Sequence, residues 1–431
     1  MNNQSVDKEG KLIFTSGSPS SIAEDFKKYL NYMMTHEVKL TKVKGYITKK
    51  DLLAIDSQMV NDKSEDPKQM IQIGYPKIHL FYHLSITLDL LRINRSTSVA
   101  VAMIQNEQVA QFMQLTSVEQ YVSLLEAFWT EADWNELQGE KWGRAPRNID
   151  FLLEELEKVP ANKVLELKRF ESIEHFVRDY GQFFYYFSYF GLWTFENDDI
   201  KSNEPKRAKS TIAKTITLSP FFKEVLEALL ETWDPYKVED SNQGFGIFAS
   251  LFNLPFEIEE EEEEEVIEEG AQNSESLFTL LKPLFPIGEL TTTLRKAKNT
   301  FLEGTYLLKV KLNTSCWRTV QLSSFHTLLD LHKIIQRAFD FDDDHLYAFY
   351  MDNKEYSEHC YNAPMDFNGP YVNEIEIGNL NLYEGQSFLY LFDFGDEWKF
   401  DVQVLKITQG ETMEEARIRK EHGASPDQYS W

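Results

Sequence analysis

Three carboxylates lie close together near the C-terminus, at Asp393, Asp396 and Glu397. Carboxylate oxygens bind hard divalent cations and can act as general acids or bases. Asp393 and Asp396 also flank Gly395, and short carboxylates beside a glycine bond the amides of a tight turn. Because a hard-metal site usually needs more oxygen ligands than one loop supplies, we interpret the group first as a solvated turn. A metal-dependent hydrolase or nuclease built on these carboxylates is the alternative.

The residues on both sides of this turn favour β-structure. Residues 388–392 are aromatic or aliphatic, and from Trp398 to Val404 apolar residues alternate with polar ones. A period of two is typical of a half-buried strand. The sequence therefore predicts a β-hairpin whose loop carries the three carboxylates.

Other metal-ligating residue types occur in the same region, namely His326, His332, His345, His359 and Cys360. None has a diagnostic spacing such as HExxH, and a lone histidine is more often structural than a ligand. A glycine-rich phosphate loop, a GxSxG elbow and a Walker lysine are all missing from the sequence. We therefore expect no metal and no cofactor.

The composition is that of a globular protein of two or three domains, with 431 residues and 42% hydrophobic content. Two cysteines are too few for a disulfide scaffold and suit reduced thiols. The N-terminal residues lack the apolar core of a signal peptide, and the aromatic run 183–193 is too short and tyrosine-rich to span a bilayer. We predict a cytoplasmic location.

The net charge of −26 opposes non-specific binding to a phosphate backbone. Ten of the acidic residues are glutamates between Glu257 and Glu269. Such a run repels itself and favours a solvated spacer, although a basic partner or a shielded basic surface would also suit it. We predict a helical region over 1–256, an acidic spacer and connector over 257–300, and an α+β domain over 301–431.

Apolar residues recur at helical spacing in the first region, from Ser20 or Ser21 onward and over 78–91, 118–129, 170–190 and 221–233. The order helix, strand, polar excursion, strand, helix occurs twice. The first copy begins with 80–91 and ends with a helix from Thr116 or Ser117. The second runs from 183–193 to a helix over 220–233. This order is typical of a winged helix-turn-helix.

Winged helices bind DNA with a helix in the major groove and with basic wings on phosphates. The predicted wings carry cations, and those of the second copy form the most basic stretch of an acidic protein. These cations would contact DNA. Alternatively, they belong to polar loops that keep the protein in solution. The candidate nucleic-acid-binding residues are Arg92, Arg95, Lys206, Arg207, Lys209 and Lys214.

The last region predicts two strands, 305–312 and 316–322, and a helix that Thr327 caps together with Asp330. An acidic turn over 340–344 leads into a strand over 345–351. The stretch 374–382 is compatible with one more strand before the closing hairpin. The expected fold is α+β, with a mixed or antiparallel sheet and one main helix.

Five spaced motifs resemble the plasmid pRiA4b ORF-3-like family: YLLKVKL, CWRTVQL, LLDLHKIIQRAFDFDDDHLYAF, YLFDFGDEW and HGASPDQY. The resemblance implies a compact α+β domain found in bacteria, often near mobile elements, with a poorly defined role. The resolvase activity sometimes attached to the family is not carried over, because no serine has a recognisable catalytic setting. The family-signature positions are Trp317, Arg318, His332, Asp344, His345, Asp393, Gly395, Asp396 and Trp398.

The first region is similar to helicase-associated winged helices, through LTKVKGYITKKDL and FGLWTF followed by ITLSP. Together these patterns predict a non-enzymatic bacterial protein whose winged-helix-like units bind DNA or a protein partner. The alternatives are the metal-dependent hydrolase and a protein-binding scaffold. The scaffold would use the acidic run and the aromatic face of the C-terminal sheet.

Overall fold

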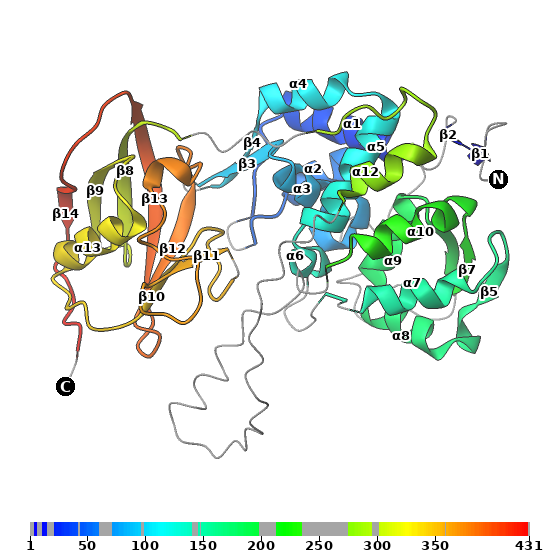
Figure 1. Cartoon of the computed structure of the whole chain (residues 1–431). Helices are drawn as coiled ribbons and strands as arrows, with labels where there is room; N and C mark the ends of the chain where they lie inside the picture. The colour runs from blue at the N-terminus through cyan, green and yellow to red at the C-terminus, as the bar shows by residue number, and fades with distance from the viewer. Residues whose placement is uncertain are drawn as a thin grey trace, which may run out of the picture. The chain divides into compact units, whose positions relative to one another are not determined.

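The computed structural model is a mixed α+β protein with two compact units (Figure 1). The helical unit comprises Met1–Arg92, Ala102–Glu239 and Ile258–Ala297, and the sheet unit comprises Ile93–Val101, Asp240–Glu257 and Lys298–Trp431. The structure describes residues 4–6, 11–14, 21–41, 44–59, 71–95, 99–139, 145–146, 148–197, 213–234, 275–294, 301–357 and 359–429. The glutamate run and the cations Lys206, Arg207 and Lys209 lie outside these residues.

Helices form most of the helical unit, as its apolar periodicity predicts. The predicted stripe of the first helix, from Ile22 to Met33, is buried. The helices are α1 (Ser21–Thr35), α2 (Lys49–Asp56), α3 (Pro76–Thr87), α4 (Asn106–Gln114), α5 (Ser117–Glu126), the π-helical turn η2 (Ala127–Glu131), α6 (Trp134–Gln138), α7 (Ile149–Glu157), α8 (Glu171–Asp179), α9 (Gly181–Tyr189), α10 (Pro220–Glu231) and α12 (Leu277–Leu281), with short 3-10 turns at Gln72–Gly74, Leu167–Arg169 and Lys282–Leu284.

The core of this unit is aromatic. Trp129 and Trp134 pack edge to face, with ring centroids 5.6 Å apart, and both are fully buried. Each indole satisfies its N–H with a backbone carbonyl, Trp129 with Leu229 and Trp134 with Phe128. Large rings that bury area and still satisfy their polar atoms stabilise a core without a desolvation cost.

Two strand pairs are inserted between these helices. β3 (Leu91–Asn94) pairs with β4 (Val101–Ile104) between α3 and α4. β6 (Trp193–Asn197) pairs antiparallel with β7 (Ala213–Leu218) between α9 and α10, and β5 (Val164–Glu166) extends that sheet. The order helix, strand, strand, helix therefore occurs twice. In the first copy, the helix that begins at Ser117 is preceded by α4, which the sequence did not predict.

A two-stranded sheet of β1 (Gln4–Val6) and β2 (Leu12–Phe14) lies near the start of the chain.

The sheet unit contains one antiparallel seven-stranded sheet in the order β11-β10-β12-β13-β8-β9-β14. The helix α13 (Leu328–Phe339) packs on one face of it (Figure 1). The strands are β8 (Gly304–Lys311), β9 (Trp317–Ser323), β10 (Tyr347–Tyr350), β11 (Cys360–Asn362), β12 (Ser387–Phe392), β13 (Trp398–Gln409) and β14 (Arg417–His422).

Alternation along the strands builds the core beneath α13. Tyr306, Leu308 and Val310 of β8 are buried in one cluster with the α13 residues Leu328 and Leu331. Successive side chains of a strand point to opposite faces. Lys309 and Lys311 therefore lie on the face away from α13.

One predicted strand is wrong. Within 374–382 the structure has a 3-10 turn, Ile377–Asn379, and Glu376 contributes only an isolated bridge to Thr327. Asn381 takes a positive φ of 49°, which an extended strand cannot accommodate. β11 and β14 were not predicted. β14 lies at the sheet edge, where its largely exposed polar residues leave no alternating pattern.

Across the described ranges, every helix is too short or too polar to cross a lipid bilayer.

The capping box at the start of α13 gives a first prediction. Thr327 accepts a hydrogen bond from the Asp330 amide, and Asp330 accepts one from the Thr327 amide. Thr327→Ala leaves amides of the first turn without a partner and should lower the unfolding free energy of the sheet unit by about 1 kcal/mol. Hydrogen exchange should show lost protection in the first turn of α13. The control is Thr314→Ala in an exposed turn, and equal effects of the two variants would contradict the prediction.

Candidate functional site

The predicted hairpin is confirmed, because β12 pairs antiparallel with β13. Asp393 begins its turn with a positive φ of 57° and is only 7% exposed. One carboxylate oxygen of Asp393 accepts hydrogen bonds from the amides of Gly395 at 2.9 Å and Asp396 at 3.3 Å. A short acidic side chain that bonds amides two and three residues ahead stabilises a tight turn.

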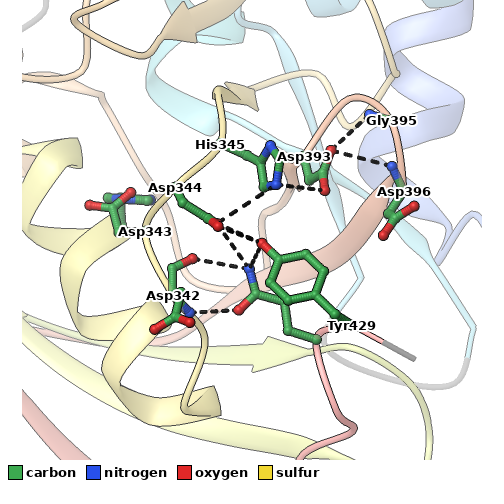
Figure 2. A network of polar contacts seen from close by, with 10 residues as sticks. Asp342, Asp343, Asp344, His345, Asp393, Gly395, Asp396 and Tyr429 are labelled. Atoms are coloured by element: carbon green, nitrogen blue, oxygen red, sulfur yellow. Dashed lines mark hydrogen bonds and ion pairs between the residues drawn. The ribbon is translucent and has the colours of Figure 1, made fainter. Parts of the chain in front are cut away.

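The other two carboxylates of the loop do not converge on Asp393. The Asp396 carboxylate points away from Asp393 (Figure 2). Glu397 accepts a hydrogen bond from the Tyr356 hydroxyl at 2.7 Å and from Lys399 at 2.9 Å. These bonds, that of Tyr356 first, lower the pKa of Glu397. Asp393 and Glu397 therefore have separate partners, and the loop does not direct the three carboxylates at one point.

His345 approaches the turn from the acidic stretch before β10 (Figure 2). Its Nε2 lies 3.5 Å from Asp393 Oδ2 and 3.7 Å from Asp344 Oδ1. The Asp344 carboxylate also accepts a hydrogen bond from the Tyr429 hydroxyl, at 2.6 and 2.8 Å from its two oxygens. This cluster joins residues far apart in sequence, but its acidic members are already engaged with neighbours.

No group of three or more histidine, cysteine or acidic side chains in the described ranges is arranged to hold a metal ion. The donor set of the hairpin agrees with that result, because Asp393 serves the turn and Glu397 is paired with Lys399. A site for Mg²⁺ or Ca²⁺ needs several oxygens directed at one point.

His332 of α13 is the buried centre of a polar chain beside this cluster. Its Nε2 is 2.8 Å from Asp343 Oδ1, and its Nδ1 is 2.7 Å from the Tyr390 hydroxyl, which also accepts from Gln336. Its ring stacks on Tyr347, with centroids 3.6 Å apart and planes 1° apart. All these bonds are satisfied when a neutral imidazole donates from Nε2 to Asp343 and accepts from Tyr390 at Nδ1.

Burial decides the charge of this imidazole. His332 is completely buried, and the loss of hydration lowers its pKa to about 4 although the Asp343 carboxylate opposes the shift. The neutral ring suits an acceptor role toward Tyr390, whose own burial holds its pKa well above the usual range. The chain from Asp343 to Gln336 therefore fixes the acidic turn to α13 and β12.

Arg318 of β9 is a buried cation, only 3% exposed. Its Nε donates to the carbonyl of Ala338 at 2.7 Å, in the last turn of α13, and its guanidinium lies 4.7 Å from the Phe339 ring centroid. Nη1 donates to the carbonyls of Trp317, His422 and Gly423, and Nη2 donates to Ser425 Oγ at 2.8 Å. One guanidinium therefore joins β9, the end of α13 and the segment after β14.

The two signature tryptophans have different surroundings. Trp398 is half-buried and packs edge to face on Phe341, with centroids 4.9 Å apart. Trp317 is half-buried on the face of the sheet away from α13, with Lys309 and Lys420 over its ring.

The candidate wing cations that the structure describes differ in their environment. Arg92 forms two bonds with Asp89, at 2.7 and 2.8 Å. Arg95 has its amide bonded to the Gly385 carbonyl, and its carbonyl accepts from Gln403. Lys214 is exposed on β7.

The geometry of the sheet unit can now be compared with known proteins. Residues 305–428 match the model of the plasmid pRiA4b ORF-3-like protein family. This ORF-3-like region contains every signature residue predicted from the motifs. The chain has no match among curated proteins. A solved structure, a protein of unknown function, MM3350, from Methanosarcina mazei Go1, is 29% identical over 29% of this chain and 72% of that chain, with a TM-score of 0.25.

Sequence reasoning missed Asp343, Tyr390, Gln428 and Tyr429 as partners of the signature residues. Tyr390 lies 58 positions from His332, and Gln428 bonds the Asp342 amide across 86 positions. No local spacing could have identified these pairs. The only available signal was that the tyrosines and the glutamine lie inside the motifs YLFDFGDEW and HGASPDQY, which carry the family resemblance.

The buried guanidinium gives a second prediction. Lysine cannot reproduce the planar fork that bonds Ala338 and Ser425 together, so Arg318→Lys should lower the unfolding free energy by about 3 kcal/mol. Hydrogen exchange of residues 422–429 should accelerate. The matched control is Arg337→Lys, because Arg337 is exposed and donates to one carbonyl, that of Ala416. A loss below about 0.5 kcal/mol for Arg318→Lys would contradict this role.

His332 gives a third prediction. Its folded-state pKa is lowered, so the unfolded chain binds the extra proton first as the pH falls, and stability is lost between about pH 6.5 and pH 4. Between pH 7 and pH 5 the wild type should lose about 2 kcal/mol more than His332→Gln in urea unfolding. The control Tyr390→Phe should be less stable than the wild type at both pH values and keep most of the slope. Equal slopes for wild type and His332→Gln would refute the assignment.

Proposed function

We propose that this is a non-enzymatic, cytoplasmic bacterial DNA-binding protein, associated with mobile elements, whose region 1–256 contains two winged-helix-like segments. The single observation that carries the proposal is the repeated order of helix, strand, strand and helix at α3-β3-β4-α4 and α9-β6-β7-α10. In each copy the chain between the paired strands is where a wing would lie, and cations occur at these positions.

The second copy favours phosphate contact more than the first. Lys214 is exposed at the start of β7, directly after the stretch that carries Lys206, Arg207 and Lys209. In the first copy Arg92 is already held by Asp89. A guanidinium that bonds a carboxylate in two places must lose that pairing to reach a phosphate. We therefore assign the principal contact with duplex DNA to the second copy.

The acidity of the chain does not exclude this function. Ten of its carboxylates are concentrated between Glu257 and Glu269, and exposed charges farther apart than about 8 Å are largely screened at physiological salt. Local positive charge can therefore act on a phosphate backbone while the net charge stays negative. The acidic run would also limit non-specific binding, because it competes with DNA for the same cations.

The alternative of a metal-dependent hydrolase gains no support from the hairpin carboxylates, which do not point at one another. The alternative of a protein-binding scaffold stays a prediction, and a stoichiometric protein captured without nucleic acid would favour it.

Duplex binding tests the proposal. The full chain should shift a labelled duplex at low salt, with an affinity that falls linearly on a log–log plot against salt concentration. Lys206, Arg207 and Lys209 changed together to alanine should weaken binding at least tenfold and reduce the salt slope by up to about 0.9 for each lost phosphate contact.

The control changes three exposed lysines elsewhere, Lys158, Lys282 and Lys333, to alanine, so that net charge falls equally. If both variants weaken duplex binding equally, the change in net charge alone explains the effect, and the wing assignment is contradicted. Failure of the wild type to bind duplex DNA at 50 mM salt would overturn the proposal itself.

A further inference from the structure

The sheet of the ORF-3-like region has one face that no α-helix covers within the described part of the sheet unit, where α13 is the only α-helix and packs on the opposite face. Arg318, Val320 and Leu322 point toward α13 and are buried. Strand alternation places Trp317, Thr319 and Gln321 on the other face. We call this surface, at strands β8, β9 and β14, the open face.

Cross-strand pairing gathers positive charge on the open face. Lys309 lies opposite Thr319, and Lys311 lies opposite Trp317. On the other side of β9, Lys420 lies opposite Thr319, His422 opposite Trp317, and Arg417 opposite Gln321. Residues directly opposite each other in adjacent strands project from the same face. The same rows include one carboxylate, Asp401, which lies 3.8 Å from Lys311.

Trp317 lies at the centre of these charges. The Lys309 ammonium is 4.4 Å and the Lys420 ammonium 5.3 Å from its ring centroid. The His422 imidazole stacks on it, with centroids 5.1 Å apart and planes 19° apart. The indole is half-buried, so part of its surface is open to solvent. A protein of net charge −26 thus presents one aromatic platform surrounded by cations.

An aromatic platform among cations suits single-stranded nucleic acid. Unpaired bases stack on aromatic side chains without regard to sequence, and lysines beside them bind the backbone phosphates. In a duplex the base faces are stacked inside, so a flat sheet with one indole cannot reach them. A purely acidic peptide would satisfy the cations and leave the indole unused.

We propose that the open face binds single-stranded DNA, with a base stacked on Trp317 and phosphates held by Lys309, Lys420 and Arg417. The choice of DNA over RNA rests on the proposed function of the helical unit. The stacking surface itself does not depend on that function. His422, already parallel to the indole, offers a second ring for an adjacent base.

Anisotropy of a fluorescein-labelled oligothymidylate with the full chain tests this proposal. Trp317→Ala should weaken binding about tenfold and leave the salt slope unchanged, because it removes stacking and no phosphate contact. Trp317→Phe should keep most of the affinity. Lys309→Ala should reduce the slope of log affinity against log salt by about 0.7, the value for one phosphate contact on a single strand.

Lys333→Ala is the matched control, because Lys333 is exposed on α13, which covers the opposite face. It should bind like the wild type. The proposal is overturned if the oligothymidylate does not bind, if Trp317→Ala binds it unchanged, or if a peptide of residues 257–269 competes as strongly as unlabelled oligothymidylate. Tighter binding of the matching oligouridylate would refute the assignment to DNA.

The single-strand proposal and the wing proposal can be tested separately. The Lys206, Arg207 and Lys209 variant should bind the oligothymidylate normally, and Trp317→Ala should bind duplex DNA normally. If duplex binding fails while single-strand binding requires Trp317, the open face stands and the wings do not.

Discussion

The sheet unit depends on one buried guanidinium. A charge removed from water is costly unless its donors are satisfied, and Arg318 has no carboxylate among its partners in the described structure. It is stabilised by carbonyls, and one of these, that of Ala338, belongs to the C-terminal turn of α13, where the helix dipole favours a cation. Its other bonds hold the segment after β14, so β9, the helix and the end of the chain are fixed by the same group.

The hydrogen-bonded chain through His332 also joins separate parts of the sheet unit. The ring bonds Asp343 on one side and Tyr390 on the other, so the acidic turn is fixed to the centre of β12. The tail completes this arrangement, because Gln428 bonds Asp342 and Tyr429 bonds Asp344 (Figure 2). The signature residues of the ORF-3-like region are therefore mainly the groups that hold the helix, the turns and the tail together.

With the core face closed in this way, the chemistry open to a ligand is on the other face. Trp317 and Arg318 are adjacent in sequence and point in opposite directions, one onto the open face with lysines over its ring and one into the core. The same alternation that builds the core under α13 thus gathers the cations of β8 and β14 around a single indole. A ligand of this unit would meet the open face, at β8, β9 and β14.

The sequence by itself determined the local elements. The alternation around the FDFGDEW turn, the Thr327 capping box and the helical stripe from Ile22 to Met33 are properties of neighbouring residues, and all three are confirmed. The strand expected over 374–382 was wrong because Asn381 takes a positive φ and Glu376 forms only an isolated bridge to the distant Thr327.

Only the tertiary structure decided which chemistry those elements bring together. Asp393, Asp396 and Glu397 are neighbours in sequence, yet the turn directs their carboxylates to different places. Lys420 is far from Lys309 and Trp317 in sequence, yet strand pairing places all three on one surface. Strand register and burial of the opposite face set this arrangement, and both depend on contacts between distant parts of the chain.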